Sequence, residues 1–147
     1  MDTQDNIKQL EQLPCINFSL RKAVRVLNRI YDQYLAEAGL TGGQFSILYV
    51  VHELDVATNK KLQSILVLDQ TTLIRNLKPL LREGYLSSVP SVTDRRQKNL
   101  SLTPEGRVKF LEAKEQWFKA QQKIYKELGP ELSEQLISLS DTVVKLD

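Results

Sequence analysis

The sequence predicts a mainly α-helical fold with one small β-ribbon, and three observations support this prediction. Apolar residues recur at three- and four-residue spacing along most of the 147 residues, as they do on the buried faces of helices. Glycines that can end helices fall between these periodic segments, at Gly39, Gly84 and Gly129. Two short runs of strand type, residues 85–89 and 99–102, flank a polar segment that is typical of a hairpin tip.

Three helices are expected in the first part of the chain. A long helix should cover residues 16–38, just after Pro14. A second should begin after Thr41, whose hydroxyl can cap it, and end at the polar segment 55–59. A short third helix is expected over residues 60–66.

A fourth helix, residues 70–83, carries the pattern on which the predicted function depends. Asp69 is placed to accept hydrogen bonds from the free N–H groups of its first turn. One face is apolar and predicted to be buried, with Leu73, Ile74, Leu77, Leu80 and Leu81. The opposite face is polar and basic, with Thr71, Arg75, Lys78 and Arg82 in one stripe and Thr72 and Asn76 beside it.

The segment after Gly84 predicts a two-stranded ribbon. Residues 85–89 and 99–102 should pair, with the charged sequence SVTDRRQK at the tip. A ribbon with a basic tip that follows such a series of helices is typical of the wing of a winged helix-turn-helix. We therefore expect such a module over residues 40–103.

Two further helices complete the chain. Thr103, Pro104 and Glu105 form a strong helix start, and this helix should reach about residue 128. Gly129 and Pro130 break it, and the last segment, residues 133–146, is again amphipathic.

Positive charge is concentrated in the middle of the chain. Residues 60–110 hold ten Lys or Arg and four Asp or Glu, so this part carries +6 while the rest carries −4. Such a division is expected when one module meets a polyanion. An ordinary solvated basic surface is the alternative.

Composition argues against several classes of protein. A single cysteine, Cys15, forms no internal disulfide, and it provides too few ligands for a classical zinc site together with the single histidine, His52. We expect neither a metal nor a cofactor, and no phosphate-binding glycine loop or nucleophile motif indicates an enzyme. No run of 18 apolar residues and no basic, apolar leader is present, so a cytoplasmic protein is expected.

The exposed face of residues 70–83 fits the major groove of DNA. Arginine can bind guanine edges and asparagine can bind adenine, and this helix carries Arg75 and Asn76. Two guanidinium groups at the wing tip, Arg95 and Arg96, can enter a minor groove or bind phosphates. The alternatives are a solvated surface helix and a solvated hairpin tip.

Three strings carry a family resemblance: LTGGQFSIL, LDQTTLIRNLKPLLREGYL and DRRQKNLSLTPEG. They resemble the MarR family of bacterial transcriptional regulators, and the match covers most of the chain. Its most specific part is the ordered set Asp69, Thr72, Arg75, Gly84, Asp94, Arg96, Leu102, Thr103 and Gly106.

The resemblance implies a homodimer in which residues 1–38 and 104–147 form the dimerisation helices of a single domain, residues 1–147. The apolar terminal helices support this independently. Two winged modules would then bind successive major grooves of a pseudo-palindromic double-stranded DNA operator, more often to repress transcription than to activate it. By position in the family pattern, Arg96 enters the minor groove and Asp94 orients it, while Arg95 contacts phosphate.

The expected DNA-binding residues lie on two elements. On the recognition helix they are Gln70, Thr71, Thr72, Arg75, Asn76 and Lys78, and on the wing they are Asp94, Arg95, Arg96 and Lys98. Pro79 departs from a regular recognition helix: it removes the hydrogen bond to the Arg75 carbonyl and should bend or loosen the helix. Pro79 itself is expected on the exposed side of the helix. Arg82 is therefore left out of the site.

Two forms of control are considered. Cys15 begins the first long helix, where the helix dipole favours a thiolate, and the peroxide-sensing OhrR branch of the family carries a sensing cysteine near this position. Cys15 is thus a candidate redox sensor, with a buried interface cysteine as the alternative. A small aromatic or lipophilic effector would bind a pocket formed by Tyr31, Tyr34, Phe45 and Tyr49, unless these aromatics are plain core.

Two minor alternatives remain. As the single histidine, His52 is a candidate pH sensor, but a hydrogen-bonded helix residue is the more common case. The main rival function is a winged helix that binds a protein and no longer DNA. The presence of Thr72, Arg75, Asp94 and Arg96 argues against that rival.

Overall fold

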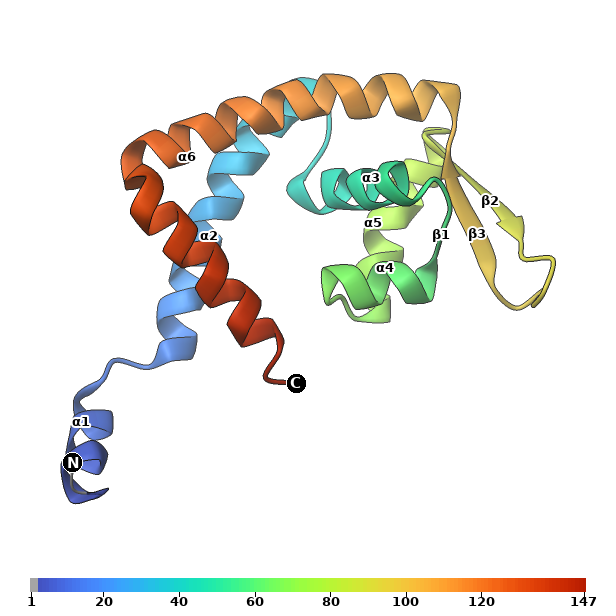
Figure 1. The fold of residues 1–147 in the computed structure, drawn as a ribbon. Helices are drawn as coiled ribbons and strands as arrows, with labels where there is room; N and C mark the ends of the chain where they lie inside the picture. The colour runs from blue at the N-terminus through green and yellow to red at the C-terminus, as the bar shows by residue number, and fades with distance from the viewer. Residues whose placement is uncertain (1–2) are drawn as a thin grey trace. The chain divides into compact units, whose positions relative to one another are not determined.

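The structure is a computed structural model that describes residues 3–147 and is mainly helical with one small antiparallel sheet (Figure 1). This confirms the predicted fold class. The chain forms two compact units, Met1–Ile30 and Tyr31–Asp147, so the boundary falls inside helix α2. The single domain over residues 1–147 stays a prediction.

The first unit consists of α1 (Thr3–Gln12) and most of α2 (Ile16–Leu35). The break between them contains Pro14, which lacks an N–H donor and disfavours helical backbone in the residue before it. Helix α1 is not among the predicted elements, because Ile7 and Leu10 supply only a minimal apolar face.

The second unit begins with the end of the first long helix, which follows the prediction. α2 passes into the 3-10 turn η1 (Ala36–Ala38), and Gly39 closes it in the left-handed conformation at φ 71°. Thr41 then caps α3 (Gly42–Leu54): its hydroxyl accepts the N–H of Gln44 at 3.3 Å, and the Gln44 side-chain oxygen accepts the N–H of Thr41 at 3.0 Å. This reciprocal pair is a capping box.

The helix-turn-helix consists of α4 (Asn59–Leu66) and α5 (Gln70–Arg82). A side chain caps each helix, since Thr58 accepts the N–H of Lys61 at 3.2 Å and Asp69 accepts the N–H of Thr72 at 2.7 Å. The turn between the helices passes through Val67 at φ 52° and ψ 50°. β-Branched residues rarely adopt this left-handed conformation.

The wing belongs to a three-stranded sheet with the order β1-β3-β2. The strands are β1 (Ala57–Thr58), β2 (Leu86–Pro90) and β3 (Lys98–Leu102), all antiparallel. The predicted pairing of the two ribbon strands is confirmed by β2 and β3, but residues 57 and 58, expected in a loop, add a third strand to β3. In Figure 1 the hairpin of β2 and β3 extends away from the helices of this unit.

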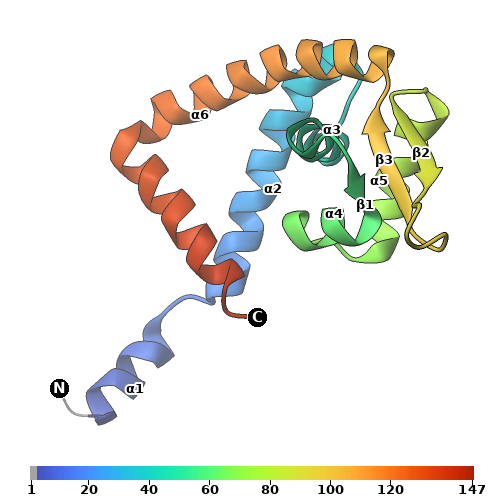
Figure 2. The same ribbon diagram turned by 45° about the vertical axis from the view of Figure 1, so that its right-hand side comes forward.

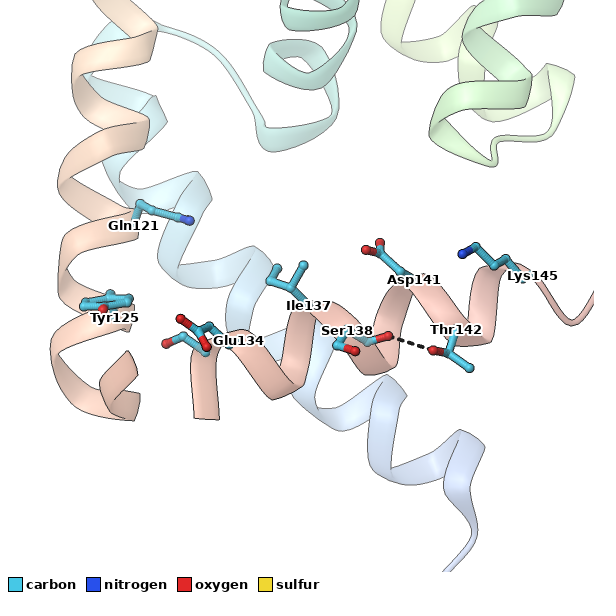
Figure 3. A pocket seen from close by; sticks show the side chains of 9 residues that line it. Gln121, Tyr125, Glu134, Ile137, Ser138, Asp141, Thr142 and Lys145 are labelled. Carbon is cyan, nitrogen blue, oxygen red and sulfur yellow. Dashed lines mark hydrogen bonds between the residues drawn. The ribbon is translucent and has the colours of Figure 1, made fainter. Parts of the chain in front are cut away.

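Helix α6 (Pro104–Val144) contains the predicted break. Thr103 caps its start, and Gly129 interrupts the helical backbone at φ 79° and ψ 169°, immediately before Pro130. The two parts of α6 border an open groove of about 580 Å³, shown in Figure 3. Gln121 and Tyr125 line it before the break, and Ile137 and Asp141 are among the lining residues after it.

The core of the second unit surrounds α3. Figure 2 views α3 almost along its axis, between α6 and α4. Its buried residues are Phe45, Ile47, Leu48, Val50 and Val51, so α3 is covered around most of its circumference. The core also contains Leu35, Leu62, Leu73, Leu77, Leu80, Leu86, Leu100 and Phe110.

The predicted apolar face of α5 is only partly buried. Leu73, Leu77 and Leu80 are at most 4% exposed, whereas Ile74 is 47% exposed and Leu81 is 38% exposed. The prediction was wrong for these two residues, because the buried stripe follows a narrower set of positions.

Across the described residues, none of the helices combines the length and the apolar character that a membrane span requires.

Candidate nucleic-acid interface

The start of α5 is fixed by Asp69. One carboxylate oxygen accepts the N–H of Thr72 at 2.7 Å, and the other accepts the Thr72 hydroxyl at 2.9 Å. These two hydrogen bonds, together with the positive charge of Arg75, lower the pKa of Asp69. The ionised carboxylate thus holds the first turn of the recognition helix.

The exposed side of α5 presents uncommitted polar and basic groups. Gln70, Thr71, Arg75 and Lys78 are all exposed. Among the residues that the structure describes, the ion pairs do not include Arg75 or Lys78. Both side chains are therefore available to an anionic partner.

Thr72 and Asn76 are turned toward the protein. Both are half-buried; Thr72 bonds to Asp69, and the Asn76 amide donates to the Thr72 carbonyl at 3.1 Å. A Cβ added at Gly43 would lie only 2.9 Å from the Asn76 side-chain oxygen, so this amide packs against the start of α3. We therefore assign Asn76 to the positioning of α5 and not to its exposed face.

Pro79 does not end the recognition helix. α5 continues through Pro79 to Arg82, and Pro79 is half-buried rather than exposed. The Pro79 carbonyl accepts the N–H of Glu83 at 2.9 Å, so the last turn keeps its hydrogen bonding. Arg82 lies 3.5 Å from the Glu83 carboxylate through its Nε.

The wing tip is organised by Asp94. Its carboxylate accepts the backbone N–H of Arg96 at 3.0 Å, and its carbonyl accepts the N–H of Gln97 at 3.0 Å. Asp94 thus holds the Arg96 backbone, and its role in orienting the Arg96 guanidinium stays a prediction. Arg95, Arg96 and Lys98 are exposed, and the ion pairs of the described residues include none of them.

The root of the wing is joined to α6 by a short set of contacts. The Thr103 N–H donates to the Tyr85 carbonyl at 3.1 Å, and the Thr103 hydroxyl donates to the Gly84 carbonyl at 2.5 Å. A Cβ added at Gly106 would lie 1.8 Å from the Tyr85 carbonyl oxygen. Only glycine therefore permits this approach of α6 to the wing.

Comparisons with known proteins agree with this geometry. The model of the MarR family matches residues 40–98, which include α3, α5 and the wing tip. The transcriptional regulator MosR of M. tuberculosis, solved in complex with DNA, is 30% identical, with a TM-score of 0.76 over 88% of this chain and 96% of MosR. The chain belongs to the MarR family.

Two curated relatives extend the comparison. The multiple antibiotic resistance protein MarR of Salmonella typhimurium is 30% identical over 79 residues, which is 54% of this chain and 55% of the relative. The HTH-type transcriptional regulator TtmR of Methylorubrum extorquens is 32% identical over 104 residues, 71% of this chain and 52% of TtmR. The chain thus spans about half the length of the curated relatives it matches.

The aromatic residues named for an effector pocket separate into different environments in this MarR-family chain. Phe45 is buried and stacks with Phe110 at 5.8 Å and with Trp117 at 6.0 Å between ring centroids. Tyr49 lies against the same rings and is 39% exposed. These contacts are those of core packing, and an effector pocket stays a prediction.

Tyr31 and Tyr34 are both half-buried. The Tyr31 hydroxyl donates to the side-chain oxygen of Gln121, and burial raises the Tyr31 pKa. Tyr31 therefore links the end of α2 to α6 within the second unit.

Cys15 and His52 lie in ordinary surroundings. Cys15 is exposed at the start of α2, and its carbonyl accepts the N–H of Ser19 at 3.0 Å. His52 stacks on Phe110 with 4.4 Å between centroids, and its Nδ1 lies 3.3 Å from the Glu53 carboxylate. His52 is thus a partnered helix residue, while a redox role for Cys15 stays a prediction.

Proposed function

We propose that this chain binds double-stranded DNA as a homodimer and regulates transcription, with α5 in the major groove and the wing tip in the minor groove. In this proposal Thr71 and Arg75 contact base edges, and Gln70 and Lys78 contact the backbone. Arg96 enters the minor groove, while Arg95 and Lys98 bind phosphates. Such a protein acts in the cytoplasm on a pseudo-palindromic operator, and repression is its proposed mode.

The observation that carries the proposal is that one small module presents two exposed pairs of basic side chains, one on α5 and one on the wing tip. Arg75 and Lys78 project from α5, and Arg95 and Arg96 from the wing tip, all without ion-pair partners among the described residues. With Lys98, five exposed Lys or Arg side chains would face the DNA backbone and grooves, against the one wing-tip acid Asp94, whose carboxylate accepts the Arg96 N–H. In helix-turn-helix proteins, one helix reads base edges in the major groove while arginines outside it bind the adjacent minor groove. The two pairs of basic side chains fit these two roles.

The membership in the MarR family and the DNA complex of MosR support the proposal. The exposed apolar side chains on the last part of α6 support association through helices, because Ile137, Leu139 and Val144 are more than half exposed in the single chain. The proposals of an effector and of Cys15 oxidation rest on residue positions alone. Both are therefore tested in the experiment below.

The deciding experiment selects duplexes from a random-sequence pool with the purified protein and then measures affinity at several salt concentrations. We expect an enriched pseudo-palindrome, two chains per duplex by sedimentation, and a steep loss of affinity with salt, about 0.9 logarithmic units per tenfold change in salt for each neutralised phosphate. A failure to enrich any sequence would leave the protein-binding winged helix as the better description.

Control by oxidation or by a ligand is measured on the same enriched duplex. Peroxide should weaken binding in the wild type and not in Cys15→Ser if Cys15 is the switch. Weakening by a small aromatic acid in both proteins would instead identify an effector.

A further inference from the structure

An exposed isoleucine lies on α5 at the border between the basic stripe and the buried leucines. Ile74 is 47% exposed, three residues after Thr71, directly before Arg75 and four residues before Lys78. The leucines on either side of it in the buried stripe, Leu73 and Leu77, are 0% and 4% exposed. Ile74 is also absent from the partly buried side chains that pack against the core.

An exposed apolar side chain beside a basic stripe can pack against an apolar group of whatever the stripe binds. Residues spaced three and four apart lie together on a helix surface, so Ile74 shares its exposed face with Thr71 and Lys78. In the major groove, each base pair presents hydrogen-bonding groups, and the C5-methyl of thymine is the apolar group among them. We infer that Ile74 recognises a thymine methyl in each half-site, which makes it a specificity-determining residue; this rests on the proposed DNA-binding function.

The position along the helix supports the same partner. Ile74 lies in the second turn of α5, between Thr71 and Lys78 on the helix surface and close to the end that Asp69 caps. In helix-turn-helix proteins the first turns of the recognition helix reach the base edges. Leu81, which is also exposed, lies seven residues later and beyond Pro79, so it serves as a matched apolar control.

The experiment removes the methyl group from the DNA and the side chain from the protein. The probe is the duplex most enriched from the random pool by the wild-type protein, with each symmetry-related pair of thymines replaced in turn by uracil, which lacks only the C5-methyl. Binding is measured for the wild type, Ile74→Ala, Ile74→Val and Leu81→Ala. Thermal unfolding and sedimentation of each variant confirm that fold and dimer are retained.

We expect one thymine pair at which uracil weakens wild-type binding about three- to fivefold per half-site, the amount for one buried methyl group. Ile74→Ala should remove this penalty at that pair alone, Ile74→Val should keep part of it, and Leu81→Ala should keep all of it. Any penalties at other thymines should persist in Ile74→Ala.

The inference is overturned if no uracil substitution affects the wild type, or if the penalty at every thymine survives Ile74→Ala. It is also overturned if Ile74→Ala acts by weakening the dimer. These outcomes leave selective, salt-sensitive binding intact, whereas the absence of any enriched duplex would contradict the proposed function itself.

Discussion

Gly106 in the first turn of α6 faces the carbonyl oxygen of Tyr85 so closely that a Cβ would lie 1.8 Å from that oxygen. Gly106 is buried, and its N–H donates to the Thr103 hydroxyl at 2.9 Å. The same hydroxyl donates to the Gly84 carbonyl. The wing root and α6 therefore meet in backbone contact at Tyr85 and Gly106, and the Thr103 hydroxyl bridges the two elements.

Gly106→Ala should destabilise the protein, because the added methyl group must displace backbone that is already hydrogen-bonded. Overpacking of this kind costs about 1–3 kcal/mol, which denaturant unfolding will measure. Arg107→Ala, at the neighbouring exposed position, is the control and should change stability little. Equal stability of Gly106→Ala and wild type would contradict the close approach.

Asp69 should make the stability of the helix-turn-helix depend on pH. Its pKa is lowered in the folded protein, so its capping contribution is present above the ordinary Asp pKa of about 3.9 and is lost as the pH falls through the lower folded value. The difference in melting temperature between wild type and Asp69→Ala should therefore shrink at low pH. Thr58→Ala removes an uncharged cap, so its difference should not follow the same titration.

Val67 should be a site where a polar residue stabilises the chain. Its φ of 52° is costly for a β-branched residue, its side chain is 65% exposed, and Asn tolerates the left-handed conformation. Val67→Asn should raise stability by about 1 kcal/mol, which corresponds to about 2–4 °C in Tm for a chain of this size. Val92→Asn, at a fully exposed valine of the wing tip, should be neutral.

Asn76 should affect binding by holding α5 in place and not by reading a base. Asn76→Ala is expected to weaken all duplexes to a similar extent, and Gly43→Ala should do the same because its Cβ displaces the Asn76 amide. The double variant should lose less than the sum of the two, since both act on one contact. If Asn76→Ala instead relaxed the preference at a single base pair, Asn76 would be a base-reading residue.

Arg96 should contribute more to DNA affinity than its neighbour Arg95. Arg96→Ala is expected to weaken binding at least about tenfold, because a guanidinium in a narrow minor groove experiences enhanced negative potential. Arg95→Ala should weaken all sequences alike and reduce the salt slope by about one, as loss of a phosphate contact does. Unchanged affinity of Arg96→Ala would remove the wing from the site.

Local signals made much of the fold predictable. The side chains of Thr41, Asp69 and Thr103 accept hydrogen bonds from residues three positions later, and Gly39 and Gly129 have positive φ. Each of these effects depends only on residues within one helical turn. Strand β1 was missed because two residues carry no periodicity, and its partner Leu100 lies more than 40 positions away. That pairing depends on the tertiary structure and not on nearby sequence.

The sequence predicted which elements carry the basic residues of the candidate site better than it predicted which way their side chains face. Arg75 and Lys78 lie on the predicted helix and Arg95 and Arg96 at the predicted hairpin tip, and all four are exposed. Helical spacing alone did not show that Ile74 is exposed, because a regular apolar face includes it. The inward turn of Asn76 depends on the close approach of α3 at Gly43, which a pattern along a single helix does not contain.

The edges of the small sheet bear on how copies of this protein associate. A long exposed strand edge is a template for pairing between chains and hence for aggregation. Here β1 is only two residues long, and β2 ends at Pro90, which has no N–H to donate. The wing therefore extends outward with little capacity to pair with a strand of a neighbouring molecule, so its exposed position does not make it a site of aggregation.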